Sequence, residues 1–336
     1  NTIGIALQEG FNKWAKAGLT AFLSYEYRNF ALTDTTNIPG QRIINNYKES
    51  SLSIGGELSK KQGKLLHYNI LGELAIAGED AGQFSVEGRG DLNLRLFGDT
   101  VRLDVNAFIK NQNPVFYFRH FQSKHYWWDN NDLSKIMRTR LEGKLSLNRW
   151  GTQLRAGVEN IKNYTYLANA SIPVKDSEGN VTGFKNNAAV RQHSGNIQIF
   201  TAMLQQKLKV GIFHLDGEVA YQKSSEQDIL PLPELSAYGN LYMKFGLAKK
   251  VLQIEMGADV RYFSKYYAPD YSPVIGQFYN QNPDDKIEIG AFPIVNVYAN
   301  LHLKRTRFFI MMYHVNAGSG KSNYFLAPHY PINPRM

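Results

Sequence analysis

The fold of this chain is decided by VEGRGDLNLRL at residues 86–96 and TVRLDVNAFIK at residues 100–110. In both stretches apolar and polar residues alternate, and only a β-strand has a side-chain period of two residues. Phe97, Gly98 and Asp99 separate them, which predicts a hairpin of two long strands. Each strand has about ten residues, roughly what a tilted strand needs to cross a bilayer. No amphipathic helix is evident that would cover the apolar face, so we expect lipid to cover it.

The composition excludes several classes of protein. Only 43% of the residues are hydrophobic and no apolar run approaches the roughly twenty residues of a transmembrane helix. Zero Cys removes zinc-thiolate sites, iron–sulfur clusters and disulfides. The 20 Tyr and 19 Phe suit a membrane barrel with aromatic girdles. Barrels often exceed the usual domain length, so residues 1–336 are expected to form a single domain.

The same alternation recurs along the chain and predicts about fourteen strands. They are expected near residues 2–8, 15–28, 49–59, 65–77, 84–96, 100–111, 136–148, 152–161, 196–208, 212–222, 236–248, 251–262, 293–304 and 307–316. The stretch 196–208 alternates less clearly and is expected to contain a β-bulge. The predicted fold class is all-β, a transmembrane antiparallel up-and-down β-barrel.

The connections between these strands alternate in length. Short ones are expected at 9–14, 60–64, 97–99, 149–151, 209–211, 249–250 and 305–306. The connections between them are long, at 29–48, 112–135, 162–195, 223–235 and 263–292, with 78–83 as the one short member of this series. Short periplasmic turns and long outer loops are typical of outer-membrane barrels.

This sorting predicts where the two ends lie. The first and last strands would both have their free ends on the side of the long loops. Single-chain barrels normally begin and end in the periplasm, so we expect a chain truncated at both ends, with at least one further strand on each side. The complete barrel would then have sixteen strands or more.

The formal charge of +9 is concentrated in the short connections. The bases there are Lys60, Lys61, Lys64, Lys207, Lys209, Lys249, Lys250, Lys304, Arg305 and Arg307. They are expected to meet anionic headgroups at one rim, which makes outer-membrane lipid and lipopolysaccharide the expected partners and the bacterial outer membrane the expected location. Nucleic acid is not an expected partner, because the bases are not gathered on one element with stacking aromatics.

The polar faces of the strands are the candidate functional surface. The residues predicted to line the lumen are Glu87, Arg89, Asp91, Arg95, Arg102, Asp104, Arg138, Arg140, Glu142, Lys144, Arg155 and Glu159. Charges of both signs on a pore wall set a transverse field that tunes which solutes pass. The alternative is that they only pair across strands to fill a polar lumen. The residues predicted to face lipid are Leu92, Leu94, Val101, Leu103, Val105, Leu141, Leu145 and Leu147.

A second candidate lies in a long loop at residues 125–132, HYWWDNND. Tyr126, Trp127 and Trp128 are interpreted first as part of the interfacial girdle or as a self-packed loop. Adjacent indoles beside amides and carboxylates would also suit a sugar, and the Asp residues a calcium ion. No metal site or cofactor is predicted from this pattern.

Catalytic motifs are weak. The sequence GSGKS at 318–322 mimics the end of a phosphate-binding loop, but Val315 stands where the motif needs Gly and no helix is expected to follow. No arrangement of Ser, His and acid can be assembled from spacing, so an enzyme is not expected. A barrel hydrolase with a Ser–His pair at the outer leaflet remains a minor alternative.

The tail NYFLAPHYPINPR at 323–335 resembles the segment before the final strand in a family of porins from Bacteroidetes-type bacteria. The turn at Arg305, Thr306 and Arg307 fits the same family. The resemblance implies an outer-membrane barrel and supplies no catalytic or binding residues. The closing strand of that family, which normally ends in an aromatic residue, is not seen here.

The predicted function is a porin-like channel for passive diffusion of small hydrophilic solutes through a charged lumen. The alternative is a structural barrel that anchors lipoproteins or a larger outer-membrane export, assembly or uptake complex. Long loops or a plugged lumen would favour that alternative.

Overall fold

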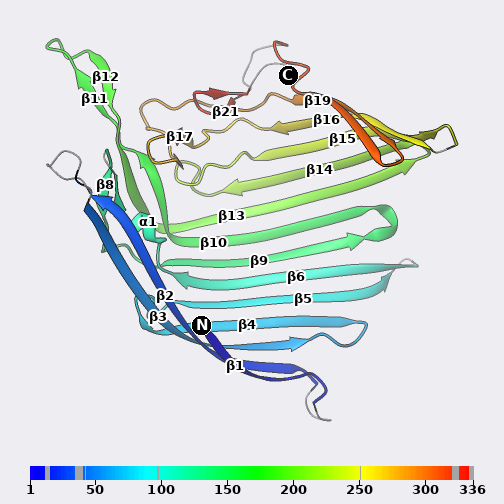
Figure 1. Cartoon of the computed structure of the whole chain (residues 1–336), viewed down its shortest axis with the longest axis horizontal. Helices are drawn as coiled ribbons and strands as arrows, with labels where there is room; N and C mark the ends of the chain where they lie inside the picture. The colour runs from blue at the N-terminus through cyan, green and yellow to red at the C-terminus, as the bar shows by residue number, and fades with distance from the viewer. Residues whose placement is uncertain are drawn as a thin grey trace.

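The computed structural model describes residues 1–11, 16–34, 41, 43–96, 98–123, 125–249, 251–319 and 325–332. The chain forms one sheet of 14 strands in which each strand pairs antiparallel with its neighbour along the chain (Figure 1). The strands are β1 (Thr2–Leu7), β2 (Gly18–Asp34), β3 (Ile43–Lys60), β4 (Leu66–Gly78), β5 (Phe84–Leu96), β6 (Asp99–Gln112), β9 (Ile136–Leu147), β10 (Thr152–Asn169), β13 (Ala188–Val210), β14 (Phe213–Ser224), β15 (Leu235–Leu247), β16 (Leu252–Phe263), β19 (Ile294–Leu303) and β20 (Thr306–Met312). The all-β meander predicted from the alternation is confirmed.

Two hairpins extend beyond their predicted bounds. β2 and β3 stay paired as far as Asp34 and Ile43, and β10 and β13 as far as Asn169 and Ala188. The predicted loops 29–48 and 162–195 are therefore too long, because backbone pairing continues where the alternation weakens. Residues 35–40 and 42 of the first loop, and residue 97 of the predicted turn 97–99, lie outside the described residues.

Two details of the strand prediction are wrong. The stretch 196–208 pairs regularly, and the irregularity lies just before it, where the register of β10 shifts between Lys162 and Tyr164. The last strand ends at Met312 rather than at residue 316, although Val315 N still donates to Val295 O. Local alternation reports which face a residue occupies, whereas bulges and strand ends depend on the partner strand.

The two ends of the sheet differ as the sequence predicts. Short connections gather at one end and long ones at the other (Figure 1). The long-loop end also carries small elements that the sequence did not predict: α1 (Phe116–Arg119), β7 (His120–Gln122), β8 (Trp127–Asp129), β11 (Ile172–Lys175), β12 (Val181–Lys185), β17 (Asp270–Ser272), β18 (Gln277–Tyr279), β21 (Phe325–Ala327) and β22 (Tyr330–Pro331). At the short end, η1 (Asn148–Trp150) closes one turn.

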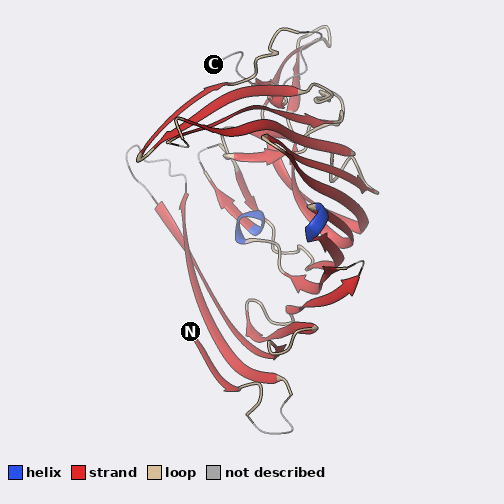
Figure 2. Cartoon of the chain, turned by 90° about the vertical axis from the view of Figure 1, so that its right-hand side faces the viewer, coloured by secondary structure: helices blue, strands red, loops and turns tan. Residues whose placement is uncertain are grey.

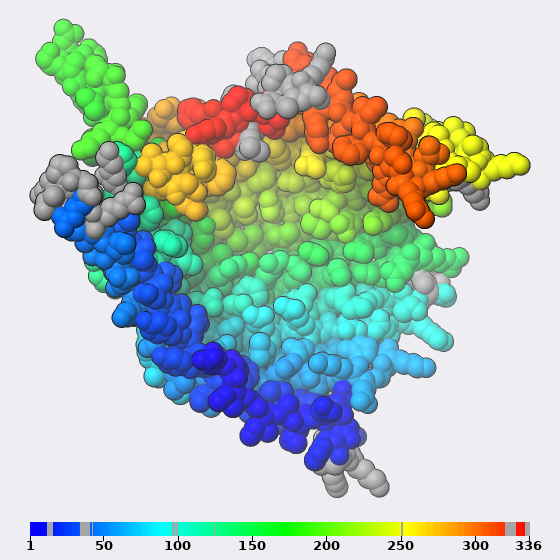
Figure 3. Space-filling model, viewed as in Figure 1, coloured from blue at the N-terminus to red at the C-terminus, as the bar shows by residue number. Residues whose placement is uncertain are grey.

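The sheet is rolled into a deep trough. Seen from its end it follows an arc, with β1 and β20 at the two edges (Figure 2). Its inner face is hollowed, with the middle strands at the floor (Figure 3). Among the described residues, β1 and β20 do not pair with each other, and no helix has the length and apolar character of a membrane span.

Alternation assigns the side chains to two faces. The outer face is apolar and solvent-exposed, with Leu141 and Val105 among its members. Val101 is the exception, because it is buried although it was predicted to face lipid. It lies on β6, which packs against η1, and the short turn covers this end of the strand. An apolar convex surface and a polar concave one are the arrangement that lipid outside and water inside require.

Glycine is needed at the turn that ends η1. Gly151 adopts φ 64, a left-handed conformation that residues with a side chain rarely take. A Cβ there would lie 2.3 Å from the Lys207 carbonyl oxygen. The tight turn between β9 and β10 therefore depends on this glycine.

The assignment of faces predicts opposite effects for adjacent positions on β6. Val105→Arg places a charge on the outer face near mid-strand and is expected to destabilise the protein in lipid by about 2–4 kcal/mol. Asn106→Arg places the same charge on the inner face and is expected to cost about 1 kcal/mol or less. Urea unfolding of protein folded into lipid vesicles measures both. Equal losses would contradict the assignment.

Candidate functional site

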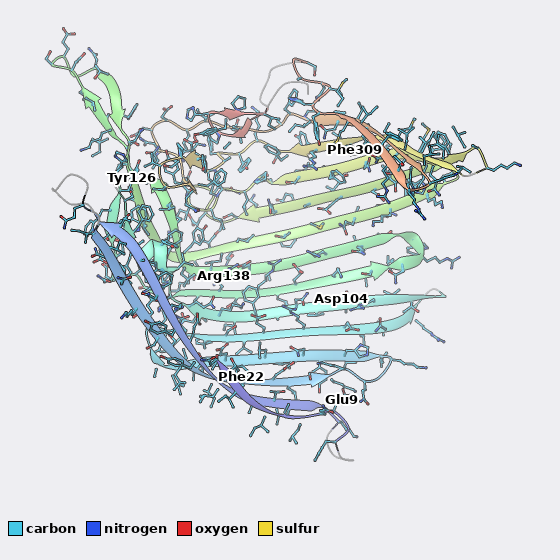
Figure 4. The ribbon with its side chains drawn as sticks, in the orientation of Figure 1. Glu9, Phe22, Asp104, Tyr126, Arg138 and Phe309 are labelled. Carbon is cyan, nitrogen blue, oxygen red and sulfur yellow. The ribbon has the colours of Figure 1, made fainter. Side chains whose placement is uncertain are left out.

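The predicted charged residues lie together on the inner face. Directly opposite residues of an antiparallel pair share a face, and the register sets Arg89 opposite Asn106, Asp91 opposite Asp104, and Lys144 opposite both Asp104 and Arg155. By the same register, the whole predicted set occupies one side of β5, β6, β9 and β10: Glu87, Arg89, Asp91, Arg95, Arg102, Asp104, Arg138, Arg140, Glu142, Lys144, Arg155 and Glu159. Arg138 and Asp104 are labelled on these strands in Figure 4.

One group of these charges is centred on Asp104. Arg102 Nε donates to Asp104 Oδ1 over 2.8 Å, and Lys144 Nζ lies 3.1 Å from the other oxygen. Arg102 also approaches Asp91 to 3.7 Å. Asp91 in turn lies 2.9 Å from His67 Nδ1 on β4. The network therefore links β4, β5, β6 and β9.

A second group lies closer to the long loops. Arg138 Nε donates to Glu159 Oε1 over 2.8 Å, and Arg140 pairs with Glu142. Arg155 lies 3.8 Å from Glu142, beyond hydrogen-bond distance. Because the guanidinium groups of these pairs are solvated, each pair contributes about 0–1 kcal/mol. Their main effect is to set the potential of the wall, because their contribution to stability is small.

The opposite part of the arc has a different lining. Tyr238, Tyr242 and Tyr298 share the inner face of β15, β16 and β19. The Tyr242 ring stacks on His214 with centroids 4.9 Å apart, and Tyr298 Oη donates to Asn240 Oδ1 over 3.2 Å. Rings and amides therefore line this wall beside charged residues that share the same face, among them Asp216, Glu255 and Asp259.

The connection 113–135 folds into the trough. Its single helical turn α1 brings Phe116 onto the inner face of β2, where the ring stacks on Phe30 with centroids 3.8 Å apart. Tyr47 on β3 packs edge-on against Phe116, and Asn45 Nδ2 donates to Gln122 Oε1 over 3.0 Å. Figure 1 labels α1 at the long-loop end of the sheet. This inward loop, residues 113–135, narrows the trough at its long-loop end.

Buried charges hold the inward loop in place. Arg119 donates to Glu49 on β3 and to Glu79, each over 2.7 Å. Glu49 is only 7% exposed and also lies 3.2 Å from Arg28 Nε. Arg28 also forms an ion pair with Asp80, and Asp80 accepts a hydrogen bond from Ser51 over 2.7 Å. Breaking a buried pair leaves an uncompensated charge, so this cluster is a strong anchor.

The predicted aromatic residues belong to the inward loop. Trp128 stacks on Phe121 with centroids 4.6 Å apart and donates from Nε1 to Tyr117 O over 2.9 Å. Tyr126 is buried and Trp127 is exposed (Figure 4 labels Tyr126). This packing corresponds to the self-packed loop. The girdle interpretation does not fit it, because the loop turns toward the inner face of β2 and β3. Among the described residues, no group of three or more acids or histidines could hold a metal ion.

The sequence did not reveal the anchor, as we call the buried charge cluster that holds the inward loop. Arg28, Glu49, Asp80 and Arg119 come from two strands and two loops, and nothing in their spacing brings them together. The one available signal was the unusually short connection 78–83, which carries Asp80. Residues 320–322 of the GSGKS stretch and residues 323, 324 and 333–335 of the porin-like tail lie outside the described residues.

A small polar cavity lies among the long loops. It has a volume of about 230 Å³ and is lined by Asn169, Phe184, Asp270, Tyr279 and His329, among others. Burial raises the pKa of the Asp270 carboxyl, and His329 lies 3.9 Å away. The cavity joins the hairpins β11–β12, β17–β18 and β21–β22 at this end of the molecule.

A long antiparallel meander, apolar outside and charged inside, defines the class of outer-membrane β-barrel proteins. Within that class the chain belongs to the family described as "Putative porin", which it matches over residues 1–336. The family and the fold point to the bacterial outer membrane and to a role in transport. Among curated proteins, none matches the chain.

Solved structures share the fold. The ferric enterobactin receptor PfeA in complex with BCV-L6 is similar with a TM-score of 0.62 at 12% identity, over 99% of this chain and 52% of the receptor. A double mutant of PfeA from Pseudomonas aeruginosa is similar with a TM-score of 0.59 at 11% identity, over 94% of this chain and 48% of the receptor. The chain thus spans about half the length of these receptors.

The anchor predicts that Glu49→Gln releases the inward loop. Removing one partner of a buried charge pair costs about 3–5 kcal/mol, so trypsin should cleave folded protein after Arg119 much faster than in the parent. Glu79→Gln is the matched control, because this carboxylate pairs with the same arginine but is 43% exposed, against 7% for Glu49, and its loss costs about 0–1 kcal/mol. Cleavage of both variants at the parental rate would show that the anchor does not hold the loop.

Proposed function

We propose that this chain forms the wall of an outer-membrane channel through which small hydrophilic solutes diffuse passively. The observation that carries the proposal is the concave face, where charged side chains from β5, β6, β9 and β10 line a hollow while the convex face is apolar. Charges held in a hollow need water, and a water-filled hollow inside an apolar shell is a route through a bilayer. The porin family supports the same role.

The proposal requires that the sheet edges be paired in the membrane. Each unsatisfied backbone group in lipid costs several kcal/mol, so spanning sheets close on themselves. β1 and β20 stand at the two edges of the sheet. A closed barrel would give each of them a partner and turn the trough into a lumen.

The orientation of the proposed channel in the membrane follows from the lengths of the connections at the two ends of the sheet. We place the short connections in the periplasm and the long ones outside the cell. Outer-membrane lipid and lipopolysaccharide would contact the apolar belt, and the bases near the short turns would meet anionic headgroups. Diffusion through the lumen needs no turnover chemistry, so we propose no enzymatic activity.

The second candidate is a structural subunit that anchors lipoproteins or a larger outer-membrane complex. The hairpin β11–β12 favours it, because it projects from the long-loop end (Figure 1) and exposes Ile172, Val174, Val181 and Phe184. Exposed apolar side chains on a projecting hairpin are typical of a contact surface. The channel remains the first candidate, because charged side chains line the hollow on four strands, whereas the projecting hairpin is a small part of the chain.

If the protein forms a channel, we expect an ohmic conductance when it is inserted into a planar lipid bilayer. Purified, folded protein should give discrete current steps, since the charged hollow would hold water and ions. A heat-denatured sample is the control. Bilayers that contain folded protein and carry no current would overturn the channel and favour the structural role.

The inward loop predicts how that conductance can be raised. Replacing residues 116–130 by a short Gly-Ser linker removes α1, β7 and β8 from the trough, so the single-channel conductance should increase. A linker of equal composition in place of residues 173–184 is the control, because this hairpin projects away from the hollow (Figure 1). A conductance unchanged by the first replacement would show that the loop does not narrow the route.

A further inference from the structure

We propose that the inner face of β5, β6, β9 and β10 selects anionic solutes, those bearing carboxylate or phosphate groups. This inference rests on the proposed channel and names its substrate class. Basic residues outnumber acidic ones on this part of the wall. The bases are Arg89, Arg95, Arg102, Lys110, Arg138, Arg140, Lys144 and Arg155, and the acids are Glu87, Asp91, Asp104, Glu142 and Glu159. We call this set the basic strip.

The two signs of charge lie at different depths. The side chains of four arginines are between 42% and 73% exposed: Arg89, Arg102, Arg138 and Arg155. Four of the acids are between 11% and 19% exposed: Asp91, Asp104, Glu142 and Glu159. Guanidinium groups therefore cover the carboxylates, and a solute that touches the strip meets donors before it meets acceptors.

Two of these guanidinium groups are only loosely paired. Arg155 lies 3.8 Å from Glu142, and Arg89 lies 3.7 Å from Glu87. Both distances exceed a hydrogen bond. A guanidinium carries five N–H donors in a plane that matches a carboxylate or a phosphate. Arg89 and Arg155 thus keep donors directed toward the hollow.

The strip is bounded by acidic walls. Glu57 and Glu73 lie on the inner face of β3 and β4, and the inner face of β14 to β16 carries Asp216, Glu218, Glu255 and Asp259, with Lys244 and Arg261 as the bases. The positive charge therefore lies on the floor of the trough, and Lys207 and Lys209 on the inner face of β13 extend it toward β14 at the short-turn end. An anion would be drawn to the floor and repelled from its sides.

The strip suits passage rather than tight binding. The guanidinium groups are solvated, and each contact with an anion in water is worth little on its own. Spread over four adjacent strands, they form a series of weak sites. Conduction needs sites that attract a solute and also release it.

The test measures the reversal potential of the channel in a KCl gradient. The parent protein should favour chloride over potassium. The double variant Arg138→Gln and Arg155→Gln removes two exposed charges from the strip, and the chloride-to-potassium permeability ratio should fall by about twofold or more. The matched control, Lys175→Gln and Lys185→Gln, removes two charges from the projecting hairpin and should leave the ratio unchanged.

A second measurement does not depend on current. Inorganic pyrophosphate, titrated into folded, detergent-solubilised protein, should bind the parent and the hairpin control more tightly than the double variant. If the parent protein carries no current but binds pyrophosphate more tightly than the double variant does, the channel is overturned and the basic strip is supported. A channel that conducts without preferring chloride, with equal pyrophosphate binding by all three proteins, would overturn the basic strip and leave the channel standing.

Discussion

A ladder of backbone hydrogen bonds between neighbouring strands joins every strand in this sheet. A strand that crosses lipid has no water to satisfy its N–H and C=O groups, so each group must bond to a neighbouring strand. Tight turns join strands into hairpins, and pairing between successive hairpins across the long loops completes the unbroken antiparallel meander from β1 to β20. Once the ladder is in place, the two-residue period assigns every side chain to lipid or to the hollow.

The two sets of charges on the inner face have different physical roles. The pairs on β5, β6, β9 and β10 have guanidinium groups that stand in solvent, and such a pair adds little to stability. The cluster around Glu49 is buried, and a charge there cannot lose its partner without a large cost. In the proposed channel the first set would shape the potential that a solute meets, whereas the second set holds residues 113–135 against β2 and β3.

Aromatic and ionic contacts contribute differently to the packing of the inward loop on the sheet. The Phe116 ring stacks on Phe30 and buries the surface of both rings at the inner wall. Without the loop, the Phe30 ring would face water. Arg119 then fixes the orientation through directional hydrogen bonds to Glu49 and Glu79. Neither contact lies within a sheet ladder, so this loop can differ in stability from the strands that carry it.

Alternation along the chain is enough to predict the strands, their order and the face of nearly every residue on them. Period-two alternation is a local property, and it located all the strands of the main sheet, including β5 at residues 84–96, and the charged set from Glu87 to Glu159. The alternating lengths of the connections likewise distinguished the two ends of the sheet. Tertiary structure alone decided the extension of β10 and β13, the cover over Val101, the path of residues 113–135 and the depth of each arginine relative to its carboxylate. Those features depend on contacts between residues far apart in the chain, and a period of two residues carries no information about such contacts.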